Sequence, residues 1–486
     1  MSAEAMEIVE VLGRLEAALD TLVTRGLSAA GPDDRTALAS YAAQVRGMGA
    51  AHLADALDEL LRALVEGDRQ GSVVLLRTQV RLRLLERLLT TRLVTARLRA
   101  VGVEPRPGEA PHLPEPPPLP ADDGAFLGRL AGAVESLLQS GLSAASEATV
   151  DALKVSFEEA SRRRLLRLGS TLRIASEEIA RFTRQDETFA PERLSFFLGR
   201  AWVLARGMED ALARSDAAAW ARLTTGGAVT PLKEVSLVVL GVFKRHVPGA
   251  FAAFELRCRL TRDAGPYARG DRLAWSFVFP LRADGKVPPE AMLMLEQKQK
   301  FRPAALLEGQ EITVTQVAVA EGEPRRLMLG PQARVTVGEP FDEWVPLASW
   351  DPRVTATKVA QHEPDPLSLP IELQDEVLLL RWTLGPLEDG ETHATASLEC
   401  QLDDAEEPLL FEVRAPTGPT GAPLRAALEK ARHEDPRRPL FGFVHLDRGQ
   451  LVLEPLALLG PGRPTMIALD PKNVDKAALV RAMSFD

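Results

Sequence analysis

The chain has 486 residues, of which 45% are hydrophobic and 26% charged, a balance typical of folded soluble domains rather than of a disordered chain. It holds no run of about 18 apolar residues, and its first ten residues contain three glutamates and no basic residue, so we expect neither a transmembrane helix nor a secretory or mitochondrial signal. The two cysteines, Cys258 and Cys400, are too few for a disulfide framework, which favours a reducing, cytoplasmic location.

The charge is unevenly distributed along the chain. The net charge is −10, and residues 351–486, with 14 basic and 23 acidic residues, carry −9 of it. A nucleic-acid-binding domain usually has the opposite sign, so the acidic end argues against that function there. Lysine makes up only 10 of the 58 basic residues, an arginine bias that is typical of a GC-rich bacterial genome.

Apolar residues spaced three and four positions apart predict a helical bundle over residues 1–100. Gly26 is a plausible end for the first helix, and Asp33 or Asp34 can cap the second. The expected helices run from Ile8 to Leu22, from Asp33 or Asp34 to Val45, from Leu53 to Leu64 and from Ser72 to Ala100.

Two proline-rich segments predict linkers. Residues 103–120, within a linker that we place at 101–121, contain eight prolines, a composition that excludes a helix and favours a semi-rigid polyproline II spacer. Three prolines in the nine residues from His362 predict a second linker at 361–370.

The chain contains an internal duplication. Eleven of the twenty residues at 11–30 are identical to those found 115 positions later, including Gly26-Leu27-Ser28-Ala29-Ala30 and its copy at 141–145. The period is far longer than that of a solenoid repeat. We therefore predict a second, related helical bundle over residues 122–225.

After residue 226 the hydrophobic period changes to two, which predicts β-strands in two units, 226–360 and 371–486. Trp275, Phe277 and Phe279 alternate onto one face of a strand. Phe441 and Phe443 do the same, and we expect that face to line a barrel interior. The expected strands include 237–240, 251–260, 273–279, 311–319 and 327–337, then 376–383, 393–402, 409–414, 441–446 and 450–458.

The order of elements in the last unit is β-β-β-α-β-β, with the helix at 423–433, and this order is similar to an OB-fold barrel. Segment 232–338 repeats the order if Pro289 to Lys300 is a helix; a further strand is the alternative there. The fold class that we expect is therefore multidomain α + β: two duplicated all-α helical bundles, then two β-rich, barrel-like units, the last of them OB-like.

The sequence contains no nucleophile elbow, phosphate-binding loop, zinc-protease motif or paired cysteine motif, and its seven histidines show no ligand spacing, so we expect no metal and no cofactor. One constellation, Asp284 with Glu296 and Lys298, resembles the PD-(D/E)xK nucleases. In that family two carboxylates hold Mg²⁺ and the lysine activates water. Asp284 lies in an apparent hairpin turn and Gln297 stands where the family has an apolar residue, so a nuclease is the second alternative.

Two arginine clusters are candidates for binding an acidic partner or phosphate. On the helix predicted from Ser72, one side carries four arginines. A second cluster lies within the predicted second bundle. The other interpretation is that these arginines lie on solvated helix faces or form ion pairs with acidic helices. We favour it, because the two clusters do not occupy matching positions of the repeat. The residues are Arg77, Arg81, Arg92 and Arg99, and then Arg162, Arg163 and Arg164.

Trp344 and Trp350 lie with acidic residues between the two β-rich units. They either pack at a domain junction or form a surface that binds a partner. With duplicated helical modules, a semi-rigid spacer and no catalytic motif, we expect a non-catalytic adaptor or scaffold that binds protein partners. Nucleic-acid binding through OB-like barrels and arginine-rich helices is the first alternative, and no membrane association is expected.

Overall fold

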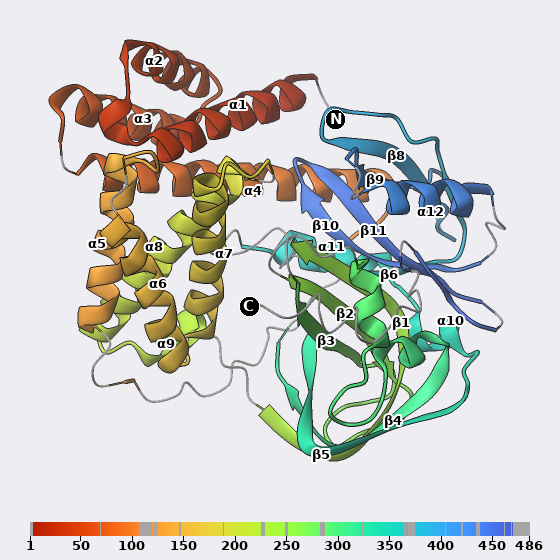
Figure 1. Cartoon of the computed structure of the whole chain (residues 1–486). Helices are drawn as coiled ribbons and strands as arrows, with labels where there is room; N and C mark the ends of the chain where they lie inside the picture. Colours follow the sequence, from red (N-terminus) through yellow and green to blue (C-terminus); the bar gives the residue numbers. More distant parts are fainter. Residues whose placement is uncertain are drawn as a thin grey trace. The chain divides into compact units, whose positions relative to one another are not determined.

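The structure, a computed structural model, contains helices and β-sheets in two compact units (Figure 1). The helical unit comprises Met1–Thr90, Ala110–Gly226 and Glu363–Leu369, and the β unit comprises Thr91–Glu109, Gly227–His362 and Pro370–Asp486. The residues that the structure describes are 3–68, 70–105, 119–120, 124–144, 147–187, 189–224, 229–247, 251–281, 287–322, 324–363, 365, 367, 375–403, 405–418, 421–433, 438–460, 462–467 and 469.

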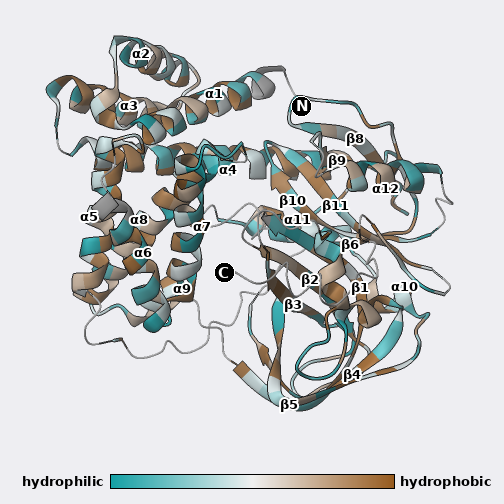
Figure 2. Ribbon diagram, in the orientation of Figure 1, coloured by the Kyte–Doolittle hydropathy of each residue, from teal (hydrophilic) through white to brown (hydrophobic). Residues whose placement is uncertain are grey.

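Hydrophobic and hydrophilic residues alternate along the helices of the helical unit (Figure 2), as amphipathic packing requires. Helix α4 belongs to this unit up to Thr90 and to the β unit from Thr91. The helices are α1 (Ala3–Arg25), the 3₁₀ turn η1 (Leu27–Ala29), α2 (Pro32–Gly47), α3 (Ala51–Glu66), α4 (Gly71–Ala100), α5 (Gly124–Ser140), α6 (Glu147–Arg162), α7 (Leu166–Thr183), α8 (Pro191–Ala213) and α9 (Ala217–Thr224).

The helix boundaries follow the repeat seen in the sequence. Moving α2 by 115 residues gives the bounds of α6, and moving α3 gives the start of α7. Gly26 and Gly141 follow α1 and α5 with φ angles of 86° and 75°. That the two halves superpose as whole domains stays a prediction.

The two glycines also touch each other. A Cβ on Gly26 would lie 2.3 Å from the backbone nitrogen of Gly141, and a Cβ on Gly141 would lie 2.5 Å from the nitrogen of Gly26. The amide of Leu142 donates to the carbonyl oxygen of Thr24 at 2.9 Å. Such reciprocal contacts are typical of segments related by a two-fold axis.

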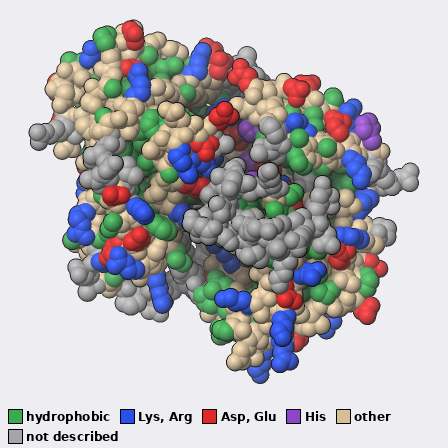
Figure 3. Space-filling model, in the orientation of Figure 1, with side chains coloured by type: hydrophobic (Ala, Val, Ile, Leu, Met, Phe, Trp, Pro, Cys, Tyr) green, Lys and Arg blue, Asp and Glu red, His purple; other side chains and the backbone are tan. Residues whose placement is uncertain are grey.

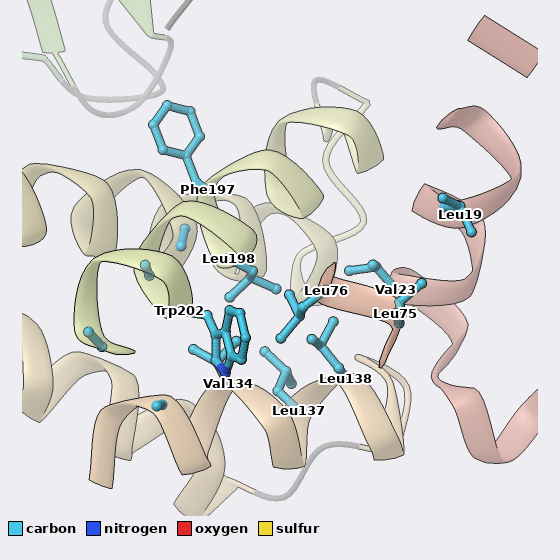
Figure 4. Packing of buried hydrophobic residues seen from close by; sticks show 14 of the residues in the cluster. Leu19, Val23, Leu75, Leu76, Val134, Leu137, Leu138, Phe197, Leu198 and Trp202 are labelled. Atoms are coloured by element: carbon cyan, nitrogen blue, oxygen red, sulfur yellow. The ribbon is translucent and has the colours of Figure 1, made fainter. Parts of the chain in front are cut away.

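One hydrophobic core joins the helices of this unit (Figure 4). Its members include Leu19 and Val23 of α1, Leu75 and Leu76 of α4 and Trp202 of α8, together with residues of every other α-helix of the unit. Leu367, from the segment that we predicted to be a linker, is buried in the same core, and Arg87 donates to the carbonyl oxygen of Asp365. Asp365 and Leu367 therefore contact the helical unit, because the apolar side chain of Leu367 is buried in its core.

The first sheet of the β unit is a closed barrel with the strand order β1-β2-β3-β5-β4. Strands β3 and β5 are parallel where they pair, and the other neighbours are antiparallel. Trp275, Phe277 and Phe279 share one face of β3, as predicted, and that face is buried in the core of the barrel. The strands are β1 (Val229–Val247), β2 (Phe251–Leu260), β3 (Arg272–Pro280), β4 (Gln310–Ala320) and β5 (Arg325–Pro340).

The second sheet has the order β6-β10-β11-β9-β8-β7, with β12 beside β11. Strands β6 and β7, at the two ends of this path, are separated in sequence only by Leu380 and Arg381. Strands β9 and β11 are parallel. The elements are β6 (Asp375–Leu379), β7 (Trp382–Leu384), β8 (His393–Cys400), β9 (Leu409–Pro416), α12 (Ala422–His433), β10 (Leu440–Asp447), β11 (Gln450–Leu458) and β12 (Thr465–Met466).

A separate hydrophobic cluster joins the two sheets, and it corrects one prediction. Phe441 and Phe443 are fully buried, yet they pack against Val238 and Leu240 of the first barrel rather than inside their own sheet. Because a strand side chain is buried equally well by either layer, alternation alone does not tell which face is the interior. Gly241 allows this approach: a Cβ there would lie 2.7 Å from the Cβ of Leu456.

The segment from Pro289 to Lys300 is neither the α-helix nor the strand that we considered. It forms the 3₁₀ turn η2 (Pro289–Met294), and a second turn, η3 (Pro303–Leu307), follows. A proline begins each turn, and Ala291, Met292 and Leu293 are buried in the barrel core, so short turns place the apolar side chains without a long helix.

Within the described ranges, no helix is both long and apolar enough to cross a lipid bilayer.

Candidate functional site

A cleft of about 640 Å³ lies in the β unit beside Trp350. The short helices α10 (Trp344–Ala348) and α11 (Pro352–Gln361) form one wall, and the ends of β6 and β8 form another. The turn that follows α4, at Val101 to Val103, also lines the cleft. Two apolar side chains of the lining are exposed, Val345 to 40% and Leu380 to 46%.

Hydrogen bonds and packing hold Trp350 in place on the wall of the cleft. Its indole Nε1 donates to Thr355 Oγ1 at 2.8 Å, and that hydroxyl donates to Asp375 Oδ2 at 2.5 Å. The ring also packs on Phe411, with 6.2 Å between centroids. The local sequence builds this corner, because Asp351 caps α11 by accepting from the amide of Arg353 at 2.9 Å and Pro352 begins the helix.

Behind Trp350, a buried ionic cluster ties the two sheets together. Asp375 accepts from Lys358 at 3.2 Å and from Arg272, while Glu376 pairs with Arg259 and, at 3.4 Å, with Arg257. Burial alone would raise the pKa of both carboxyls. The adjacent cations outweigh burial, so both pKa values lie below the ordinary range.

A second cavity, of about 420 Å³, opens over this cluster and is lined by Arg257, Arg272, Lys358 and Glu376 among others. The lining contains both cations and carboxylates, and each of its four cations, Arg257, Arg272, Arg325 and Lys358, makes at least one ion pair. We therefore interpret the cluster as a structural link between the sheets. Charge pairs of this kind specify how two surfaces fit together more than they add to stability.

The lining of the cleft beside Trp350 combines apolar side chains with one thiol and four charged groups. Its one thiol, Cys400, is only 3% exposed, and burial raises its pKa to about 11, so it is protonated at neutral pH. The charged groups at its mouth balance, since Asp351 and Asp403 stand against Arg353 and Arg381. An aromatic wall with a few polar groups is typical of ligand-binding clefts.

The two tryptophans that the sequence singled out have different environments. Trp344 is 2% exposed and packs edge-on against Phe341 within the cluster that joins the two sheets. Its indole nitrogen has no hydrogen-bond partner among the described residues. Trp344 therefore fits the domain-junction interpretation, whereas Trp350 reaches the cleft.

Arg163 is half-buried and the other arginine candidates are exposed, and several of them are ion-paired. Arg162 and Arg163 both pair with Glu159, at 3.1 Å and 2.8 Å, and Arg99 lies 3.4 Å from Glu104. These pairs favour the interpretation as solvated helix faces. The remaining exposed candidates are Arg77, Arg81, Arg92 and Arg164.

The nuclease constellation is not assembled by the described residues. Asp284 lies outside them, and Glu296 and Lys298 are exposed after the turn η2. Within the described part of the chain, no group of three or more histidine, cysteine, aspartate or glutamate residues is placed to hold a metal ion.

Sequence reasoning missed most of the cleft. Leu380 and Val345 carry no motif. Asp375 and Glu376, in the ionic cluster behind the cleft, stand among the many acidic residues of the last unit. The one available signal was the run Leu378-Leu379-Leu380, which puts an apolar side chain beyond the end of a buried strand.

Compared with known proteins, the chain matches no family model, no curated protein and no solved structure.

Proposed function

We propose that the protein is a non-catalytic adaptor that binds protein partners, and that the cleft beside Trp350 takes an apolar segment of such a partner. The observation that carries this proposal is the exposure of Leu380 and Val345 at a cleft of about 640 Å³ with an aromatic wall. Ligand clefts usually measure roughly 300–1,000 Å³ and combine apolar walls with few polar groups. A held tryptophan is also a common anchor at protein interfaces.

The topology of the β unit supports binding as the general class of function. Both sheets contain a parallel pair formed by what we take as the third and fifth strands, β3 with β5 and β9 with β11. In this interpretation β6 and β7 together form the bent first strand of the second barrel. We propose that both barrels are OB-like, a fold that serves many ligands and fixes no single chemistry.

The aromatic side chains favour a protein partner over a nucleic acid. Single-stranded nucleic acid needs exposed aromatic rings in a basic groove. Phe441 and Phe443 are buried, and the face in Figure 3 carries basic and acidic side chains side by side. The experiment must therefore distinguish a protein partner from a nucleic acid.

The experiment compares two equally exposed leucines. Leu380 lines the cleft and Leu410 lies on β9 outside its lining, and each is 46% exposed. The tagged full-length protein, Leu380→Asp and Leu410→Asp are used for affinity capture from a bacterial lysate, with and without nuclease. We expect nuclease-resistant protein partners that Leu380→Asp loses and Leu410→Asp retains. Equal capture by both variants, or capture abolished by nuclease, would refute the proposal.

A further inference from the structure

A buried polar cluster lies where three helices of the helical unit meet. It consists of Asp20 from α1, Gln79 and Arg83 from α4, and Ser195 from α8. Each of these residues is at most 6% exposed. By sequence, α1 and α4 belong to the first helical repeat and α8 belongs to the second.

The cluster connects the three helices directly. Gln79 Nε2 donates to Ser195 Oγ at 2.5 Å and lies 3.4 Å from Asp20 Oδ1. Arg83 lies 3.5 Å from Ser195 Oγ and stacks over the ring of Phe196 at 5.0 Å. Opening the contact between the repeats would therefore expose Asp20 to water.

The charges around Asp20 do not balance. The charged groups that face it are Glu16 on its own helix, Arg83 on α4 and Glu192 on α8. A single arginine thus serves three carboxyl groups, and its Nε already lies 3.6 Å from Glu16. Burial, together with the two acidic neighbours, outweighs Ser195 and Arg83 and raises the pKa of Asp20 to about 7.

The hydrogen bonds also accommodate a proton. The side-chain oxygen of Gln79 is buried and has no partner among the described residues. A half-turn of the Gln79 amide exchanges its nitrogen and oxygen, and a protonated Asp20 can then donate to that oxygen, which an ionised carboxylate cannot do.

We propose that protonation of Asp20 latches α1 and α4 onto α8, so that the two helical repeats close as the pH falls and open as it rises. In the open form water solvates the carboxylate, and its pKa returns toward 3.8. The equilibrium constant for opening then rises up to tenfold per pH unit between those two values and levels off above the higher one.

The second repeat offers a matched control. Glu135 occupies the position 115 residues after Asp20, but it pairs directly with Arg206 at 2.8 Å and accepts from Trp202 Nε1 at 2.7 Å. Glu135 therefore has a direct arginine partner and an indole donor, neither of which contacts Asp20.

The test measures amide hydrogen exchange in the full-length protein at pH 5, 6, 7 and 8, corrected for the intrinsic rates, in peptides from α1 and α4 up to Thr90. We expect the opening constant to rise roughly 50- to 100-fold from pH 5 to pH 8, as one proton requires. Asp20→Asn, an uncharged mimic of the closed form, should remove that dependence, whereas Glu135→Gln should keep it. A wild-type opening constant that is independent of pH, or a dependence that survives in Asp20→Asn, would overturn the proposal. If Asp20→Asn does not fold, the wild-type curve alone decides.

Discussion

Replacing Gly26 with alanine should destabilise the helical unit far more than the same change at Gly49. Both glycines have a positive φ, 86° and 82°, so each substitution forces an L side chain into a backbone conformation that it rarely adopts, at a cost of about 1–3 kcal/mol. Gly26, with a ψ of 150°, lies in a region that is essentially confined to glycine. A Cβ at Gly49 meets nothing within 4 Å, whereas at Gly26 it would lie 2.3 Å from the nitrogen of Gly141 and 2.4 Å from the carbonyl carbon of Ser140. These are backbone atoms, so the ends of α1 and α5 must separate.

Overpacking of a close-packed site typically adds about 1–3 kcal/mol, and a backbone clash belongs at the upper end of that range. We therefore expect a loss of about 3–5 kcal/mol for Gly26→Ala and of about 1–2 kcal/mol for Gly49→Ala. Hydrogen exchange of α1 and α5 peptides in the full-length protein measures both losses without assuming a single unfolding transition. Equal losses in the two variants would refute the direct contact between Gly26 and Gly141.

The other predictions concern the β unit and, in the last case, the whole chain. Glu376→Gln should destabilise the β unit by about 3–5 kcal/mol, because Arg259 and Arg257 then lose a buried carboxylate. Chemical denaturation, monitored by tryptophan fluorescence, measures this loss. A loss below about 1 kcal/mol would contradict the prediction. Because the pKa of Glu376 is lowered on folding, its contribution should be present above the unfolded value near 4.5 and should disappear as the pH falls through the folded value. Cys258 and Cys400 are buried with raised pKa values, so neither should react with a thiol reagent at pH 8 until urea is added, and rapid labelling of the folded protein would show an exposed thiol. Labelled single-stranded oligonucleotides should show no salt-sensitive binding to the full-length protein, and anisotropy at two salt concentrations would reveal the opposite.

Elements with a strong periodic pattern could be predicted from the sequence. Phe251–Leu260 and Gln450–Leu458 have the bounds that alternation predicted, and the helix expected from Ser72 to Ala100 extends from Gly71 to Ala100. These segments bury a regular stripe or face, so the local pattern and the final packing agree. The mixed α and β class is confirmed for the same reason.

Features that depend on a partner layer could not be predicted. The local sequence around Phe441 and Phe443 does not show that the first barrel, rather than their own sheet, covers these side chains. Leu367 is buried only because the helical unit offers it a core, and its proline-rich surroundings predicted a linker. The cleft could not be predicted for the same reason, since its exposed and aromatic residues come from separate parts of the chain: Val345 lies in α10, Trp350 between α10 and α11, and Leu380 directly after β6.

The most direct test of the proposed partner-binding cleft is site-specific photocrosslinking in living bacteria. A photoreactive phenylalanine analogue is placed at position 380, in the cleft, or at position 410, which is equally exposed on β9. The proposed function predicts one or more discrete, nuclease-resistant protein adducts at position 380 and none at position 410. Adducts that are the same at both positions, or none at position 380, would contradict it.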